Sequence, residues 1–293
     1  MELTSGFTSC LQKYLDFEIN KNTQEFTIVE GNDRILPDEE SGEKNPILLV
    51  LDSSFNPPHW GHYTLIKKSY EYYSQSYPNK KIHVLLLLSV QNADKEAKPA
   101  SFDKRMDMMC IMSRLLNKNF ESLSTYVGLT IFGKFVDKDS IIRKKFFNQG
   151  VIVYLVGFDT IIRIFDPKYY IPQALAVVLQ HFMKNVEFCC LTRSNVNDNE
   201  SEDFTNQSTY SQDILQGKYE PLIPKEWGHK INILSNNPKY INVSSSKIRK
   251  LMVPLHGTKS LNEEILNDLK KQLPNQIIEY IIQSSESKSI FSA

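Results

Sequence analysis

Residues 47–62 read ILLVLDSSFNPPHWGH, an apolar run that passes into a turn rich in Ser, Asn and Pro and then into two histidines three residues apart. The apolar run is typical of a buried strand, and the chain after the prolines is predicted to restart as a helix. A strand-to-helix turn exposes unpaired backbone amides, and the start of the helix adds positive potential. Because His59 and His62 share one face of that helix, they can reach the same group. The stretch is therefore predicted to hold phosphate.

Beyond this stretch the chain alternates apolar runs with helical periodicity, which predicts βα units on a parallel sheet. We expect strands at residues 47–51, 82–89, 126–132, 151–156, 186–191 and 231–234. We expect helices at residues 61–73, 102–116, 172–183, 245–252, 261–273 and after Pro274, with Pro172 in the first turn of its helix. The strands are almost continuously apolar, so both faces of the sheet are expected to carry helices. The fold class is thus α/β, a doubly wound parallel sheet with a helical C-terminal segment.

Two regions depart from this alternation. Residues 1–45 carry an amphipathic piece and a short strand-like segment at 26–29, and we interpret them as an N-terminal extension packed on the core. Residues 46–293 are expected to form one domain. Within it, a polar run at about 194–218 has almost no large apolar residue and is predicted to be a mobile insertion.

Composition narrows the classes of function. The 293 residues include 34 Lys+Arg and 34 Asp+Glu, so no net charge favours nucleic acid or membrane as a partner, and small charged ligands fit better. No apolar run has the roughly 20 residues that a membrane-spanning helix needs. The four cysteines, Cys10, Cys110, Cys189 and Cys190, form no C-x-x-C pair and are interpreted as reduced core residues. We expect a cytoplasmic protein, with nuclear residence left open.

Residues 54–62, SFNPPHWGH, resemble the (T/H)-x-G-H signature of nucleotidylyltransferases. The form is the long one, similar to that of the nicotinamide and nicotinate mononucleotide adenylyltransferases. The resemblance implies a Rossmann-like fold and an ATP site that includes Ser54, Phe55, His59 and His62. The alternative is a proline-stiffened turn with incidental histidines. A metal site is less well supported, because no Cys or acidic ligand accompanies the two imidazoles.

A second segment, Val243–Arg249, resembles the I-S-S-T-x-I-R motif of the same family at the start of a late helix. Serines at the cap and in the first turn offer hydroxyls and free amides, and Arg249 can donate two hydrogen bonds to phosphate oxygens. The resemblance implies that Ser245, Ser246 and Arg249 bind the phosphates of ATP. The alternative is an ordinary helix cap with a solvated basic face.

A third segment, Leu155–Thr160, is similar to the family's G-x-D at the end of the fourth strand. The resemblance implies that Gly157 allows a close approach of ATP and that Asp159 contacts a ribose hydroxyl. A strand that ends in Gly and is followed by an Asp helix cap would read the same way.

Weaker matches complete the site. Residues 98–106 resemble the family segment that supplies a phosphate-binding lysine, which is either Lys95 or Lys98. Arg193, after a strand, is similar to the arginine of the family that lies near the adenine of ATP, although an exposed arginine at the end of any strand would look identical. Tyr169 and Tyr170 lie near the position of an aromatic residue that stacks on the acceptor's pyridine ring, or else fill the core.

The matches follow the family's order over about residues 46–283, and the chain looks most like a divergent fungal branch. It departs from the family at Ser53, where glycine is usual, and at Phe158, where a small residue is usual. Both positions lie on the acceptor side, so the identity of the mononucleotide stays open.

The resemblance implies transfer of AMP from ATP to a mononucleotide phosphate, nicotinamide mononucleotide above all, to give NAD and pyrophosphate. His62, His59 and Arg249 are the expected catalytic residues, and Ser53 and Ser54 are expected to contact the acceptor together with the lysine and tyrosines. Mg²⁺ is expected to bind through the ATP phosphates, with no metal ligand from the protein. The alternative is an ATP-binding or ATP-hydrolysing protein of the same fold that acts through partners. The oligomeric state is left open.

Overall fold

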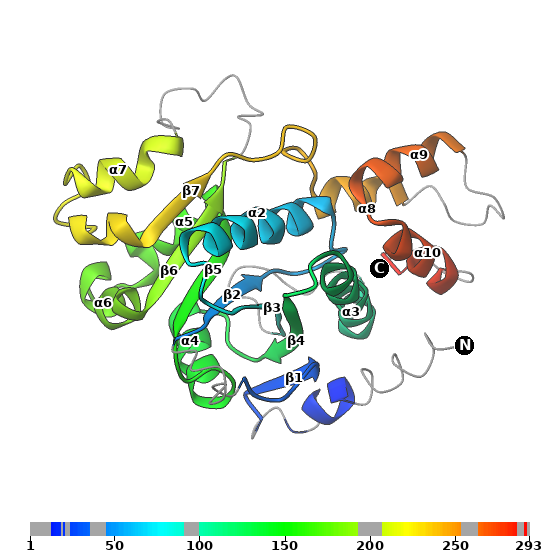
Figure 1. Ribbon diagram of the computed structural model, residues 1–293, viewed down its shortest axis with the longest axis horizontal. Coiled ribbons are helices and arrows are strands. Elements are labelled where there is room, and N and C mark those ends of the chain that lie inside the picture. The colour runs from blue at the N-terminus through cyan, green and yellow to red at the C-terminus, as the bar shows by residue number, and fades with distance from the viewer. Residues whose placement is uncertain are drawn as a thin grey trace.

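The computed structural model describes residues 13–18, 20, 24–35, 45–90, 100–192, 207–252, 263–285 and 290–291. One sheet runs through the molecule, with helices on both sides of it (Figure 1). Its strands are β1 (Phe26–Glu30), β2 (Ile47–Asp52), β3 (Ile82–Ser89), β4 (Ser124–Thr130), β5 (Val151–Gly157), β6 (Val186–Leu191) and β7 (Ile231–Leu234). All six strands expected from the apolar runs are confirmed, with β4 displaced by two residues toward the N-terminus.

The strand order is β1-β4-β3-β2-β5-β6-β7. β1 runs antiparallel to β4 and every other neighbouring pair is parallel. Leaving β1 aside, the strands follow the Rossmann order, in which the direction of the crossovers reverses between β2 and β5. The predicted doubly wound α/β fold is confirmed. In such sheets ligands bind beyond the carboxyl ends of the strands at this reversal.

Successive residues of a strand face opposite sides of a sheet, and here both sides are buried. Leu49 and Leu51 of β2 pack in a core with residues of α2 (Trp60–Ser76) and α3 (Phe102–Asn119). Leu48 and Val50 pack in a second core on the other face. This double burial explains why the strands are apolar at almost every position.

The helices divide between the two faces. On the face of α2 and α3 lie α8 (Ser245–Met252), α9 (Glu263–Gln272) and α10 (Asn275–Ser284). The other face carries α4 (Phe135–Lys145), α5 (Phe158–Ile164), α6 (Leu175–Asn185), α7 (Tyr210–Leu215) and the 3₁₀ turn η3 (Lys225–Lys230). Two further 3₁₀ turns are η1 (Pro167–Tyr169), after α5, and η2 (Gln207–Thr209), before α7. The C-terminal helices gather near α3 in Figure 1, and the predicted helical C-terminal segment is confirmed.

The helix predictions need correction. α4, α5 and α7 were not expected. Over the 11 residues of α4, only Ile141 and Ile142 supply buried apolar side chains. The helix expected from Pro172 begins instead at Leu175, and Gln173 closes a turn on the carbonyl of Tyr170. Pro172 therefore lies before the helix and not in its first turn.

The structure describes part of the N-terminal extension and part of the predicted insertion. β1 extends the sheet at its edge, and Arg114 of α3 pairs with Glu30 at the end of β1 at 2.9 Å. Residues 207–218 of the predicted insertion form η2, α7 and a following turn, and Tyr210 and Ile214 are buried. Residues 194–206 lie outside the described residues, so the mobile insertion stays a prediction.

Two further observations concern the length of the apolar helices and the state of the cysteines. Across the described ranges, no helix is both long and apolar enough to span a membrane. Cys110, Cys189 and Cys190 are buried free thiols, whereas Cys10 lies outside the described residues.

One glycine fixes the entry into β5. Gly150 has φ of +99°, and a Cβ there would overlap the backbone carbonyl of Pro46. We expect Gly150→Ala to lower the free energy of unfolding by about 3 kcal/mol or more, since a non-glycine residue in this region is strained by ~1–3 kcal/mol and the clash adds to it. Chemical denaturation measures the loss. Gly217→Ala is the matched control, because its φ is +78° but the nearest atom is the flexible end of Glu220. Equal losses in the two variants would contradict the role of the Pro46 carbonyl.

Candidate functional site

The turn after β2 and the start of α8 meet beyond the carboxyl ends of β2 and β5. Two cavities lie there, of about 630 and 260 Å³, which we call the large and the small cavity. The residues that line both of them are Asp52, Ser53, Thr160, Ser244 and Ser245. The cavities are therefore neighbours, and a ligand the size of a nucleotide can extend from one into the other.

His59 and His62 line the small cavity, where they also shape the start of α2. His59 is the N-cap residue, and its Nδ1 accepts a hydrogen bond from the backbone N–H of Gly61 at 3.1 Å. His62 Nδ1 accepts one in turn from the backbone N–H of His59, also at 3.1 Å. An Nδ1 that accepts a hydrogen bond carries no proton, so each neutral ring holds its proton on Nε2. The cap thus presents both imidazoles as Nε2–H donors.

The Nε2–H group of His62 already lies beside a polar side chain. Its Nε2 lies 3.0 Å from the Oγ of Ser53, which lines both cavities. The buried ring of Phe55, with its centroid 5.2 Å away, supports the His62 ring from behind. Gly61 is required for this arrangement, because a Cβ there would come within 2.9 Å of the His59 ring. His62 therefore aims a hydrogen-bond donor at the boundary between the two cavities.

α8 is hydrogen-bonded directly to the turn that bears the histidines. Arg249 donates from Nη1 to the carbonyl oxygen of Asn56 at 2.6 Å, and Ser245 donates from Oγ to the carbonyl of Pro57 at 2.9 Å. Arg249 and Ser246 line the large cavity, while Ser245 lines both. The two motif segments, far apart in the chain, thus form one site.

Asn56 also joins the start of α3 to this site. Its side-chain oxygen accepts from the backbone N–H of Ala100 at 2.7 Å. Arg105 donates from Nε to the carbonyl of Ala100, likewise at 2.7 Å, and lines the large cavity. Lys95 and Lys98, the lysines that the resemblance implies for this region, lie outside the described residues, and Arg105 is a cation one turn into α3 that lines the cavity.

The two arginines lie close enough to affect each other. Burial, and after it the charge of Arg249, lowers the pKa of Arg105 to about 10. Burial also lowers the pKa of Arg249. Both groups stay protonated near neutral pH, so two cations share one end of the large cavity. An anion bound between Arg105 and Arg249 would offset the repulsion between the two guanidinium groups.

The other end of the large cavity, which we call the aromatic end, carries aromatic and apolar side chains beside the charged groups of Lys134, Asp137 and Arg163. Tyr169 and Tyr170 line it together with Phe135 and Val178. Tyr170 donates from its hydroxyl to the carbonyl of Ile164 at 2.7 Å, which fixes its ring, whereas Tyr169 is 37% exposed. A flat aromatic ligand group fits this end.

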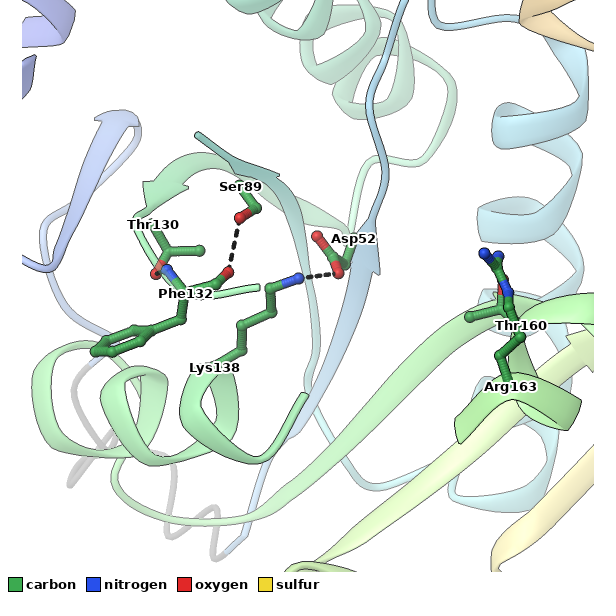
Figure 2. A network of polar contacts seen from close by, with 7 residues as sticks. All are labelled: Asp52, Ser89, Thr130, Phe132, Lys138, Thr160 and Arg163. Atoms are coloured by element: carbon green, nitrogen blue, oxygen red, sulfur yellow. Dashed lines mark hydrogen bonds and ion pairs between the residues drawn. The ribbon is translucent and has the colours of Figure 1, made fainter. Parts of the chain in front are cut away.

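A buried ion pair lies between the two ends. Lys138 of α4 donates from Nζ to Oδ2 of Asp52 at 2.5 Å, and both residues line the large cavity. Figure 2 shows the Lys138 side chain extending from its helix to the end of β2. The sequence analysis did not find this pair, because nothing in a single sequence links Asp52 to a residue on a helix that was itself not expected.

The predicted site residues divide into three groups. Ser53, Ser54, His59, His62, Gly157, Tyr169, Tyr170, Ser245, Ser246 and Arg249 line at least one of the cavities. Phe55 lies behind His62, and Asp159 points to solvent, 3.8 Å from Arg163, so that Thr160 takes its place in both linings. Lys95, Lys98 and Arg193 lie outside the described residues.

The departures from the family pattern have visible effects. Ser53 places a hydroxyl beside His62, where glycine would leave the backbone bare. Phe158 is 4% exposed and packs edge-on against Tyr210 of α7, at 5.5 Å between ring centroids. It therefore belongs to the second core and does not enter either cavity.

Comparison with known proteins agrees with the two motif segments. The model of the family described as cytidylyltransferase-like matches residues 50–251, from β2 to α8. The "Putative nicotinamide mononucleotide adenylyltransferase" of Schizosaccharomyces pombe is 36% identical over 228 residues, which cover 76% of this chain and 84% of that relative. A solved structure of Plasmodium falciparum nicotinic acid mononucleotide adenylyltransferase complexed with NaAD aligns over 82% of this chain and 96% of that chain, with 18% identity and a TM-score of 0.48.

The family match contains both histidines and α8 as far as Leu251, so it includes the site as well as most of the sheet. The chain therefore belongs to the cytidylyltransferase-like family and is a nucleotidyltransferase of the nicotinamide and nicotinate mononucleotide adenylyltransferase group.

Proposed function

We propose that the protein transfers AMP from ATP to the phosphate of nicotinamide mononucleotide, giving NAD and pyrophosphate. The observation that carries the proposal is the direct hydrogen bonding of α8 to the histidine turn, which gathers His62, Ser245 and Arg249 around two neighbouring cavities. The naming of the S. pombe relative supports this choice of acceptor.

The attacking phosphate of the acceptor is already ionised near pH 7, so the reaction needs no enzymic nucleophile. It needs alignment of the two substrates and stabilisation of the charge that develops on the α-phosphate. In this proposal the Nε2–H of His62 leaves Ser53 and donates to the α-phosphate as charge builds there. His59 and the start of α8 hold the β- and γ-phosphates. Arg249 stabilises the departing pyrophosphate, with Arg105 beside it.

The acceptor would occupy the large cavity. Its pyridine ring would lie at the aromatic end, against Tyr169 and Tyr170, and its phosphate near Ser53 and Ser54. The adenosine of ATP would occupy the small cavity, where Gly157 leaves room and Thr160 offers a hydroxyl.

Mg²⁺ would reach this site as the counter-ion of ATP. Mg²⁺ keeps several of its waters and needs few protein ligands, so the phosphates of ATP would supply its main ligands. The ion would offset part of the triphosphate charge, and the residues named above act on the oxygens that it leaves free.

The direct test is incubation of the purified protein with ATP, Mg²⁺ and nicotinamide mononucleotide, followed by chromatography of the products. We expect NAD and pyrophosphate in equal amounts. Parallel reactions with nicotinate mononucleotide and phosphopantetheine identify the acceptor. Formation of ADP and phosphate alone, whichever acceptor is present, would reject adenylyl transfer in favour of ATP hydrolysis.

His62→Ala is expected to lower kcat about 100- to 1000-fold while it changes the KM for ATP only a few-fold. The reason is that its hydrogen bond strengthens mainly in the transition state. Steady-state kinetics with purified variants provide the measurement. His229→Ala, an exposed histidine on η3, is the matched control and should leave kcat unchanged. A His62→Ala enzyme with kcat within twofold of the unaltered protein would remove His62 from the mechanism.

Arg249→Ala is expected to weaken ATP binding about tenfold or more and to lower kcat as well, because a charged donor to phosphate is lost. Calorimetric titration with a non-hydrolysable ATP analogue measures the affinity, and turnover measures the rate. Lys250→Ala, the exposed neighbour on α8, is the control for loss of one positive charge. If Arg249→Ala changed thermal stability alone, Arg249 would be a structural link to Asn56 and no more.

A further inference from the structure

Asp52 is the last residue of β2, and it places a carboxylate where the two cavities meet. One of its oxygens, Oδ2, accepts from Lys138, and Lys138 is the one described residue that hydrogen-bonds this carboxylate. The Lys138 side chain is 4% exposed, whereas that of Asp52 is 12% exposed. Because Asp52 lines both cavities, this exposed part of the carboxylate faces them.

A continuous series of contacts fixes the position of Asp52 relative to the rest of the site. His62 Nε2 lies 3.0 Å from Ser53 Oγ, and Ser53 follows Asp52 in the chain. Asp52 pairs with Lys138, whose Nζ lies 5.3 Å from the centroid of the Phe135 ring at the aromatic end of the large cavity. These contacts lead from His62 through Asp52 and Lys138 to Phe135, and Figure 2 shows the pairing of Asp52 with Lys138.

In a mononucleotide the ribose lies between the phosphate and the ring base. An acceptor placed with its phosphate near Ser53 and its ring near Phe135 therefore brings its ribose to Asp52. A carboxylate is a pure acceptor of hydrogen bonds, and the two neighbouring hydroxyls of a ribose are donors that match it. A bare carboxylate would repel the substrate phosphates, but pairing with Lys138 leaves no net charge at this point.

We propose that the Asp52 carboxylate, positioned by Lys138, accepts hydrogen bonds from the ribose hydroxyls of the acceptor and so restricts the enzyme to ribonucleotide acceptors. This inference rests on the proposed function, since it names the part of the acceptor that the site recognises. Asp52 is then a binding residue, and Lys138 is a positioning residue that acts through it.

The test compares nicotinamide mononucleotide with its 2′-deoxy and 3′-deoxy analogues. The unaltered protein should use the ribonucleotide with a kcat/KM about 10- to 100-fold above that of the poorer deoxy analogue, the range for one hydrogen bond to a charged group. In Asp52→Ala this ratio should fall to within about threefold, because the ribonucleotide and the analogue then lack the same contact. A merely structural role for Asp52 would lower both rates together and leave the ratio unchanged, which would overturn the proposal.

Glu226→Gln is the matched control. Glu226 is an exposed carboxylate on η3 that lines neither cavity, so its variant should keep both the rates and the ratio. Asp52→Asn, which keeps the side-chain shape, guards against loss of folding in Asp52→Ala, and it should give an intermediate ratio.

The positioning role of Lys138 has its own measurement. Lys138→Met leaves a largely buried carboxylate unpaired beside the phosphates, so it should lose more kcat/KM than the double variant Asp52→Asn/Lys138→Met. A double variant that is no better than Lys138→Met would contradict charge compensation by Lys138.

Failure of the inference and failure of the proposed function give different results. If the unaltered protein made no dinucleotide from any mononucleotide, the proposed function would fail. Calorimetric titration with nicotinamide mononucleotide and its deoxy analogues, without ATP, would then still decide whether Asp52 recognises the ribose. Equal affinities of the unaltered protein for all of these compounds would reject the proposal by this second route.

Discussion

The hydrogen bond from Arg249 to the carbonyl of Asn56 is the contact on which the site depends, since it joins residues 193 positions apart. The side-chain oxygen of the same asparagine accepts a hydrogen bond from the Ala100 amide, and the Ala100 carbonyl accepts one from Arg105. One short turn thus holds the starts of α3 and α8 in place. Without this junction the large cavity would lose the cationic side that Arg105 and Arg249 give it.

The order of the strands explains why this junction lies where it does. Crossovers leave β2 toward one edge of the sheet and β5 toward the other, so the chain opens a gap at their carboxyl ends. The turn after β2 fills one side of that gap, and α5 begins at its other side with Gly157 as the N-cap. α8, from the C-terminal part of the chain, covers the gap between β2 and β5. Every group assigned to phosphate is consequently held by a helix start or a strand end.

The sequence predicted those parts that are encoded locally. The strands could be recognised because both of their faces are buried, and the histidine turn and the α8 cap could be recognised because each is a contiguous motif. α4 could not be recognised, since only two of its buried side chains are apolar and its buried Lys138 pairs with Asp52, which is far away in the chain. Arg105 lay within a segment already singled out, but the Asp52–Lys138 pair joins residues 86 positions apart and leaves no local signal. The same limit explains Asp159, whose spacing fits the motif although its side chain faces solvent.

The cap of α2 links the shape of the helix to the state of its two imidazoles. The hydrogen bond from the His59 amide to Nδ1 favours the form of His62 that carries its proton on Nε2, and that amide is in place while the first turn is wound. Fraying of that single turn, which costs far less than opening the sheet, would therefore release both the orientation of the ring and its preferred tautomer.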